Sequence, residues 1–350
     1  MSRQQVRRWL FFTVAPLVLG GLLVAAVLAS PTGMRPSTTL RVLAGRLLPE
    51  GLVDLSGLKP VHFAVVWDLR LPRVVVGTFV GSALAVAGAV LQALFRNPLA
   101  EPGLTGASAG AVFGAVVAFA MGWSAAEPIA LPLAAMSGAL LALLTVYAMA
   151  TRGGVTPIPT LLLAGVAVSS LLSAAAGLIL SLQITNWQVA QEILFWTLGG
   201  LEARTWTHVW LCLPFAGIGL VCAATYCREL DLMQQGEETA AALGVEVETV
   251  KRVLIACAAI LTGAAVAVAG VIGFVGLVAP HAMRLILGSS HRWLLPSSAL
   301  AGAILLLACD LLARTLRPPL EIRLGVVTAL VGGPLFIALL LRRHREGWAW

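Results

Sequence analysis

Long apolar runs separated by short polar, proline- or glycine-containing breaks define the hydropathy pattern of this 350-residue chain. A helix needs roughly 20 apolar residues to cross about 30 Å of hydrocarbon. The runs that approach this length predict an all-α polytopic membrane protein with about ten transmembrane helices. The expected spans are Trp9–Ala29, Val74–Phe95, Thr105–Gly122, Pro128–Ala150, Thr160–Leu182, Trp206–Cys227, Val253–Gly270, Val271–Leu287, Trp293–Leu316 and Gly325–Leu341.

The composition agrees with this fold class. Hydrophobic residues make up 59% of the chain, charged residues 11%, and the mean hydropathy is +0.94. A soluble domain needs a more polar surface than this composition supplies. Because the spans leave no room for a separate soluble domain, we expect residues 1–350 to form one transmembrane domain. Its longest segments between spans are 31–73, expected outside the cell, and 228–252, expected in the cytoplasm.

The basic residues set the expected orientation. Arg3, Arg7 and Arg8 precede the first apolar run. A cleaved signal peptide also begins with basic residues, but its apolar core is usually shorter than this one. We therefore interpret the run as a retained span whose basic end lies inside the cell. With the long first external segment set aside, the remaining basic residues concentrate in the inside segments, and both termini are expected in the cytoplasm.

The sequence NPLAEPGLTGASAGA, residues 97–111, follows the second span. Its proline-containing turn is expected at a membrane surface, where water can satisfy exposed backbone groups. Glycines then recur every four residues at Gly106, Gly110 and Gly114, which predicts a flat helix face for close packing against another helix. In a chain this rich in glycine and alanine, such spacing also arises by chance.

Ionisable residues inside spans usually mark an ion or proton path, and the span centres contain almost none. The main exception is Asp310, which lies one helical turn before Arg314, so the two are expected to pair near the outer end of the ninth span. The cysteines show no CxxC spacing and the histidines are scattered. No metal or haem site is therefore expected.

The sequence contains no phosphate-binding loop. Such a loop ends in Gly-Lys-Ser/Thr, whereas the only lysines, Lys59 and Lys251, follow Leu58 and Val250. The chain is therefore not expected to be an enzyme or to bind a cofactor. If ATP drives transport, another subunit must hydrolyse it.

The cytoplasmic segment Arg228–Arg252 is polar and helix-favouring, and Gly236 and Gly244 interrupt it. Two short helices joined at a glycine fit this pattern. Its glutamates could simply form a solvated face. However, GEETAAALG, residues 236–244, is similar to the cytoplasmic coupling loop of ABC-transporter permeases, which seats in a groove of the nucleotide-binding subunit.

Further sequence blocks occur in order along nearly the whole chain. They are RLPR (70–73), QALFRNPLAEPGLTGASAGA (92–111), LLLAGVA (161–167), FWTLGG (195–200), GEETAAALG (236–244), GFVGLVAPHAMRL (273–285), HRWLLPSSALAGA (291–303) and LGVVTALVGGPLFIALL (324–340). Together they resemble the iron-chelate (siderophore or haem) and vitamin B12 type permeases of type II ABC importers. The resemblance implies a homodimer in a bacterial inner membrane, two ATP-binding subunits that hold ATP and Mg, and a periplasmic substrate-binding protein. Membrane lipid is a further expected partner, and nothing indicates nucleic acid.

The resemblance also implies roles for matching residues. They are ATPase coupling for Gly236, Glu237, Ala240, Leu243 and Gly244; binding-protein docking for Arg70, Arg73 and Arg314; a cytoplasmic gate at Thr156, Pro159 and Thr160; and a dimer-facing path along Leu161–Leu182, Glu192–Gly200 and Gly325–Phe336. Two alternatives stay open. The arginines could anchor the protein at the bilayer surface, and the prolines could merely begin the fifth span.

The sequence therefore predicts the permease subunit of an importer for an iron chelate, either haem or a ferric siderophore, driven by a partner ATPase. A cobalamin importer is the alternative within this class. An ion-coupled secondary transporter is the alternative from another class, and it would need buried ionisable residues or broken helices in corresponding repeats. A structural subunit of a membrane enzyme complex would be expected to carry cofactor ligands.

Overall fold

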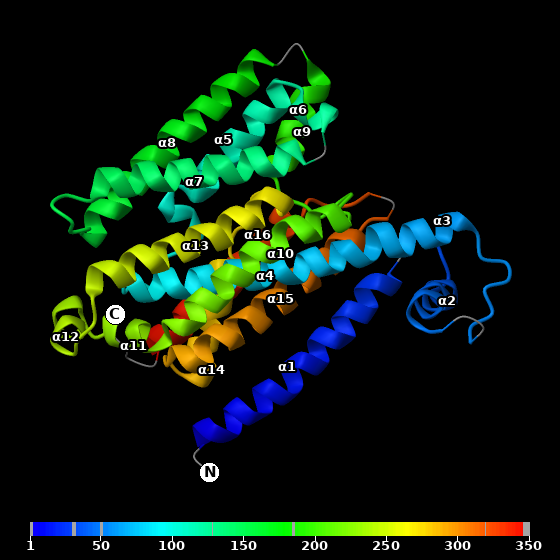
Figure 1. Cartoon of the computed structure of the whole chain (residues 1–350). Coiled ribbons are helices and arrows are strands. Elements are labelled where there is room, and N and C mark those ends of the chain that lie inside the picture. The colour runs from blue at the N-terminus through cyan, green and yellow to red at the C-terminus, as the bar shows by residue number, and fades with distance from the viewer. Residues whose placement is uncertain are drawn as a thin grey trace.

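A computed structural model describes residues 3–29, 33–49, 52–127, 129–183, 186–318 and 320–345, with the backbone alone at residues 340 and 342–345. The regular elements in these ranges are helices (Figure 1). They are α1 (Arg3–Leu28), α2 (Pro36–Leu47), α3 (Pro60–Phe63), the π-helical η1 (Ala64–Arg70), α4 (Leu71–Leu94), the 3₁₀-helical η2 (Pro102–Thr105), α5 (Ala107–Ala120), α6 (Trp123–Ala126), α7 (Ala130–Ala150), α8 (Ile158–Leu182), α9 (Trp187–Thr197), α10 (Trp206–Thr225), α11 (Cys227–Met233), α12 (Glu237–Ala242), α13 (Val247–Ala269), α14 (Val275–Leu287), α15 (His291–Thr315) and α16 (Leu324–Arg345). The expected all-α fold is confirmed.

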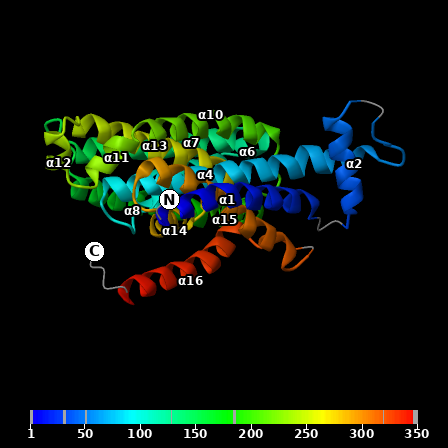
Figure 2. The same cartoon turned by 90° about the horizontal axis from the view of Figure 1, so that it is seen from below.

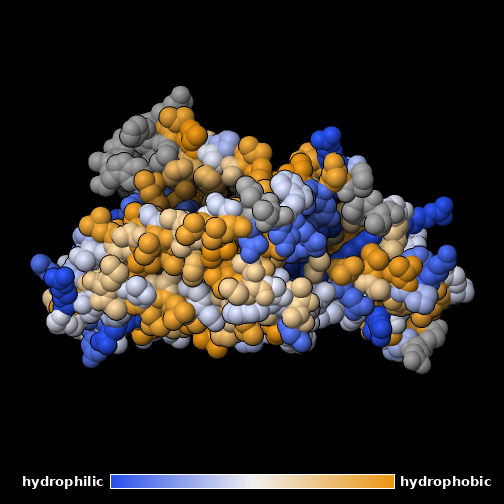
Figure 3. Space-filling view, turned by 90° about the horizontal axis from the view of Figure 1, so that it is seen from above, coloured by the Kyte–Doolittle hydropathy of each residue, from blue (hydrophilic) through white to orange (hydrophobic). Residues whose placement is uncertain are grey.

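Within the described residues, seven helices are long and apolar enough to cross a membrane, and α5, α14 and α16 are shorter apolar helices. Together they coincide with the expected apolar runs. The structure differs in length at α5 and α14, whose 14 and 13 residues extend only about 20 Å. Pro31 and Pro128, the expected first residues of the external segment and of the fourth span, lie outside the described residues. In Figure 3, apolar residues cover much of one face, and hydrophilic residues lie at both ends and in a patch near its middle.

The helix that continues from residue 60 into α4 is central to the bundle. Of its most apolar window, 78% is buried, compared with 17% for α1, so α4 lies inside and α1 at the periphery. Glycines bring the α4 backbone against two neighbours. A Cβ built at Gly81 would lie 2.4 Å from the carbonyl oxygen of Gly302 in α15, and one at Gly88 would lie 1.8 Å from that of Gly276 in α14. Only glycine allows backbones to approach so closely.

A second group of helices, α5 to α9, lies beside α13 (Figure 1). Gly110 and Gly114 pack α5 against α7, because added Cβ atoms would lie 2.3 Å from the oxygen of Gly138 and 2.2 Å from that of Ala134. Gly106 also faces α7, since an added Cβ would lie 3.2 Å from Cγ2 of Val146, but it lies just outside the helix, in contrast to the expectation. It precedes α5 as its N-cap with φ +81°, a left-handed backbone that favours glycine.

The turn before α5 enters the bundle. Asn97 is exposed, as expected at a membrane surface, but Pro102 and Thr105 are buried. The carbonyl oxygen of Leu104 lies against Gly165 of α8, where a Cβ would come within 2.2 Å. Irregular backbone is tolerated at membrane depth when protein covers it, so only the first part of this turn follows the sequence-based expectation.

The bundle has two ends, which Figures 1 and 2 show at opposite sides. We call them the α12 end, which carries α11, α12 and the turn 151–157, and the α2 end, which carries α2 and the residues before α4. In Figure 2, α16 diverges from the other helices as it runs toward the α12 end. Charged side chains with long-range contacts concentrate at these two ends.

The α5–α7 contact gives a first prediction. Gly110→Ala should force the two helices apart, because the new methyl group would overlap the Gly138 carbonyl, and it should lower the stability by about 1–3 kcal/mol. The measurement is the folded, monodisperse fraction of the purified protein after heating in mild detergent.

Gly217→Ala in α10 is the matched control, since no atom lies within 4 Å of its added Cβ. It should leave the stability unchanged or raise it slightly through helix propensity. Equal melting temperatures for the two variants would show that close α5–α7 packing is not required.

Candidate functional site

The candidate coupling segment is a hook of two short helices, α11 and α12, at the α12 end. Gly236 and Gly244, with φ of +121° and +85°, flank α12. Ala240 is fully buried, whereas Leu243 is 55% exposed and the space around Gly244 is open. Residues 241–244 are all exposed, so the tip of the hook presents an uncharged, largely apolar surface away from the bundle.

Lys251, near the start of α13, is buried beneath this hook with an exposed fraction of 1%. Its Nζ lies 3.0 Å from Oε2 of Glu237 and 2.6 Å from Oε1 of Glu248. Nζ also donates a hydrogen bond to the carbonyl oxygen of Thr156 at 2.9 Å. These three acceptors match the three donors of an ammonium group. The buried cation is therefore compensated, and it joins α12, α13 and the turn before α8.

The candidate gate residues lie at this same turn. The Thr156 N–H donates to Oε2 of Glu248 at 3.0 Å, and the Thr156 and Thr151 hydroxyl oxygens lie 2.9 Å apart. Pro159 and Thr160 are in the first turn of α8, where the missing proline N–H would have no helical partner in any case. Pro159 thus begins the helix, which was one of the open alternatives, and the gate role stays a prediction.

Asp231 forms a second link, from α11 to α15. Its Oδ1 accepts the backbone N–H of His291 at 2.8 Å and lies 2.6 Å from Nδ1 of the same residue, while Ser290 donates to Oδ2 at 3.3 Å. Partial burial alone would raise the pKa of Asp231, but the hydrogen bonds from His291 lower it below its usual value. The carboxylate therefore stays charged and caps the N-terminus of α15.

The candidate docking arginines lie together at the α2 end, around a pocket of about 290 Å³ that Glu202 and Glu321 also line. These arginines are more buried than residues at the rim of a docking surface would be. The exposed fractions of Arg70, Arg73 and Arg314 are 7%, 9% and 3%. Their docking role stays a prediction.

Asp310, fully buried, is the centre of an ion-pair network at this end. Its Oδ1 accepts hydrogen bonds from Arg73 at 2.8 and 3.0 Å, and Arg73 also reaches Glu321 at 2.8 Å. Oδ2 of Asp310 lies 3.1 Å from Arg314, so the expected pair between Asp310 and Arg314 is confirmed. Two cations and two carboxylates compensate one another, as buried charge requires.

Arg70 and Arg314 have a further contact that the sequence did not reveal. They donate hydrogen bonds to the carbonyl oxygens of Val27 at 3.3 Å and Ala26 at 3.0 Å. The last carbonyls of a helix lack intrahelical partners and favour nearby cations. These arginines therefore hold the C-terminal end of α1, the least buried of the spans, against the bundle.

Sequence reasoning missed Lys251 and Asp231 as linking residues. Lys251 carried a signal, since it is one of two lysines in the chain and follows Glu248 by three residues at the start of a span. Asp231 carried none, because its partners lie about 60 residues away. Within the part of the chain that the structure describes, no group of three or more His, Cys, Asp or Glu side chains is placed to hold a metal ion.

The similarity to known proteins extends over most of the chain. The chain is 41% identical to a cobalamin import system permease of Halobacterium salinarum, over 95% of this chain and 90% of the relative. It is 44% identical to a hemin transport system permease of Yersinia pestis, over 80% of this chain and 84% of the relative. A solved structure of an inward-facing, metal-chelate type ABC transporter has a TM-score of 0.77 and 29% identity, and the match covers 93% of this chain and 99% of the other.

A third relative, the Fe(3+) dicitrate permease of Escherichia coli, is 40% identical over 80% of this chain and 86% of its own length. The model of the FecCD transport family matches residues 16–342, which include the hook, the Lys251 link and the arginine cluster. The chain therefore belongs to the FecCD transport family of ABC permeases.

Proposed function

We propose that this chain is the membrane subunit of a binding-protein-dependent importer, working as a homodimer with two copies of an ATP-binding subunit. The observation that carries the proposal is the buried Lys251 link. It joins a hook whose exposed tip suits a protein partner to the turn from which α8 begins. A transporter powered by its own ion gradient has no need of such a connection.

In this proposal the ATP-binding subunit docks on the α12 hook. Leu243 and Gly244 face the partner, since they are exposed and no other part of the described chain surrounds Gly244. Glu237 and Ala240 face inward, where Glu237 contacts Lys251 and Ala240 is buried. The coupling residues thus divide into a contact surface and an internal anchor. ATP and Mg are held by the partner.

Closure of the two ATP-binding subunits would move the hooks, and two links transmit that motion. Lys251 connects α12 to Thr156 at the start of α8, and Asp231 connects α11 to His291 at the start of α15. With contacts of 2.6–3.0 Å, neither link can lengthen without breaking. The motion therefore reaches both helix groups of the bundle, and Thr156, Pro159 and Thr160 move as the cytoplasmic gate.

At the opposite end, the cluster of Arg70, Arg73 and Arg314 supports docking of a periplasmic binding protein. Two copies in a dimer present the cluster twice, related by symmetry, so that each lobe of the binding protein meets one copy. Because Asp310 and Glu321 partly neutralise the cluster, the remaining field mainly adjusts encounter rate and orientation.

The proposed cargo is an iron chelate, haem or a ferric siderophore. The relatives named above act on hemin, ferric dicitrate and cobalamin, all of them bulky chelates, so cobalamin remains the alternative. For an ion-coupled carrier the residues to consider are Lys251 and Asp310, but both lie in closed ion pairs near the ends of the bundle. This arrangement suits a structural role better than a proton path.

The proposed membrane is the bacterial inner membrane, with the α12 end in the cytoplasm. Arg3, Arg7 and Arg8 at the start of α1 support this orientation, because Arg8 donates to the carbonyl oxygen of Leu287 at the α12 end. The α2 end then faces the periplasm, where a binding protein would approach.

Purification of the protein from its native membranes in mild detergent tests the proposal. An ATP-binding subunit should co-purify in equal amount, and Leu243→Asp should abolish its recovery without loss of the folded permease, because that side chain faces away from the bundle. Reconstituted vesicles should then take up haem, a ferric siderophore or cobalamin. Recovery of the wild-type chain alone, dimeric and folded, would contradict the proposal.

Lys251→Met tests the transmission step. Methionine has a similar length and suits a buried position, while Glu237 and Glu248 are exposed enough, at 36% and 25%, to be hydrated. We expect normal assembly and continued ATP hydrolysis, with cargo uptake reduced at least about tenfold. Parallel assays of ATPase activity and uptake in vesicles measure this uncoupling.

The control is Arg252→Gln, a change at the next residue, whose exposed side chain hydrogen-bonds locally to Glu248 and Thr249. Its uptake per ATP should equal that of the wild type. Tight coupling in Lys251→Met would show that the link does not transmit motion.

Arg70→Gln tests docking. Loss of this charge should raise, by about tenfold, the concentration of binding protein that gives half-maximal uptake. The rate of ATP hydrolysis without binding protein should be unchanged. Arg41→Gln, on α2 at the same end, is the control, because Arg41 pairs locally with Asp54. A melting temperature that falls in Arg70→Gln while the half-maximal concentration is unchanged would contradict docking and indicate a structural role for Arg70.

A further inference from the structure

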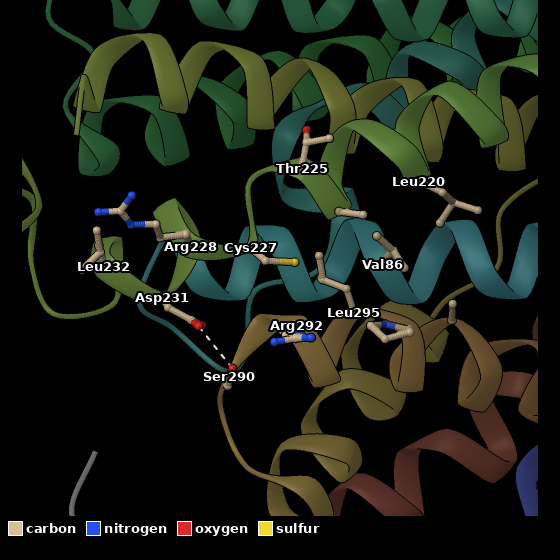
Figure 4. A pocket seen from close by; sticks show the side chains of 13 residues that line it. Val86, Leu220, Thr225, Cys227, Arg228, Asp231, Leu232, Ser290, Arg292 and Leu295 are labelled. Carbon is tan, nitrogen blue, oxygen red and sulfur yellow. Dashed lines mark hydrogen bonds between the residues drawn. The ribbon is translucent and has the colours of Figure 1, made fainter. Parts of the chain in front are cut away.

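A groove of about 790 Å³ lies between α4, α10, α11 and α15 at the α12 end, separate from the hook tip and the gate turn (Figure 4). One part of it is apolar, lined by Val86, Leu220 and Leu295. Arg228, Asp231 and Arg292 also line the groove. In Figure 4 the Arg228 side chain extends away from Val86 and Leu220, and Arg292 lies beside Leu295. The groove therefore combines a hydrocarbon-like interior with a charged mouth.

The groove opens beside surfaces that face the bilayer. Ile218 and Val221 on the neighbouring α10 are 61% and 66% exposed, as suits residues in contact with lipid. Leu220 lies five residues before the end of α10, and Ala299 lies eight residues after the start of α15. At 1.5 Å per residue the apolar part reaches roughly 8–12 Å below the helix ends, which is the depth of the first acyl carbons.

Residues typical of the lipid-headgroup level lie at the mouth. Trp293 follows Arg292, and the guanidinium carbons of Arg8 and Arg292 lie 5.2 and 5.8 Å from the centre of its ring. Tryptophan and arginine gather at the membrane interface. This aromatic and basic cluster thus places Arg292 at the phosphate layer of the leaflet that meets the α12 end.

The charges at the mouth favour an anion. Among the described residues, no carboxylate forms an ion pair with Arg228 or Arg292, and both side chains are exposed. Asp231, the carboxylate beside them, already accepts hydrogen bonds from Ser290 and His291. Two guanidinium groups are therefore available for a phosphate, which arginine binds well.

We propose that this groove binds an anionic phospholipid, with its phosphate at the mouth that Arg228 and Arg292 line and one acyl chain along Val86, Leu220 and Leu295. A free phosphate would leave the apolar part unfilled, and a soluble protein partner could not enter hydrocarbon. The lipid braces α11 against α15 beside the Asp231 link. If the proposed function holds, this site lies next to the transmission path, but lipid binding itself does not depend on that function.

Native mass spectrometry of the purified full-length protein tests the site. The protein in detergent is titrated with phosphatidylglycerol, with phosphatidylcholine of the same acyl chains, and with inorganic phosphate. We expect one phosphatidylglycerol per chain to bind at least about tenfold more tightly than phosphatidylcholine, since each arginine near a phosphate contributes substantially. Inorganic phosphate should not compete at millimolar concentration.

Three variants locate the binding. Arg228→Gln with Arg292→Gln should weaken phosphatidylglycerol about tenfold, and Ala299→Phe, which fills the apolar part, should weaken both lipids. The control is Arg96→Gln with Arg152→Gln, which removes the same charge from exposed positions at the same end but outside the groove, and it should bind as the wild type does.

Three results would overturn the proposal: equal affinity for the two lipids, an equal loss in the control pair, or displacement of phosphatidylglycerol by inorganic phosphate. Each variant is also heated in detergent. A fall in melting temperature that accounts for the lost binding would likewise exclude a specific lipid site.

Discussion

Close approach of helix backbones at glycine is the constraint on which the rest of the structure depends. In lipid no hydrophobic force drives helices together, so they associate through van der Waals contact and backbone proximity. Gly88 lies against Gly276, Gly81 against Gly302, and Gly110 against Gly138. These contacts fix α4 among its neighbours and join α5 to α7. They leave each helix group with little freedom to deform internally, so relative motion has to occur between groups.

Long-range ionic contacts lie toward the two ends of the bundle. Asp310 gathers Arg73 and Arg314 at the α2 end, and Lys251 gathers Glu237 and Glu248 at the α12 end. Charge near the ends avoids the full cost of burial at mid-membrane. It also forms directional links between helix termini. Packing therefore makes the groups rigid, and ionic contacts determine which termini move together.

Much of this architecture was predictable from the sequence. The apolar runs, the two short helices around Gly236 and the pairing of Asp310 with Arg314 follow from local periodicity and spacing. The contact of Lys251 with Thr156 did not, because Thr156 lies 95 residues away and is reached only through the tertiary fold. Gly106 shows another limit, since four-residue spacing does not reveal that this glycine also caps α5 with φ +81°.

The burial of the arginine cluster also could not be predicted from spacing along the chain, because it depends on the tertiary fold. An arginine near the end of a span reads, in sequence, as an exposed surface charge. Here Arg70 and Arg314 instead donate hydrogen bonds to carbonyl oxygens at the end of α1. Of the seven candidate spans in the described residues, α1 has the smallest buried share. These arginines can both hold α1 and attract a docking partner only if their electrostatic field reaches that partner through the small pocket that they line. The position of an arginine in the fold, more than its residue type, thus determines how much of its charge remains available to a binding partner.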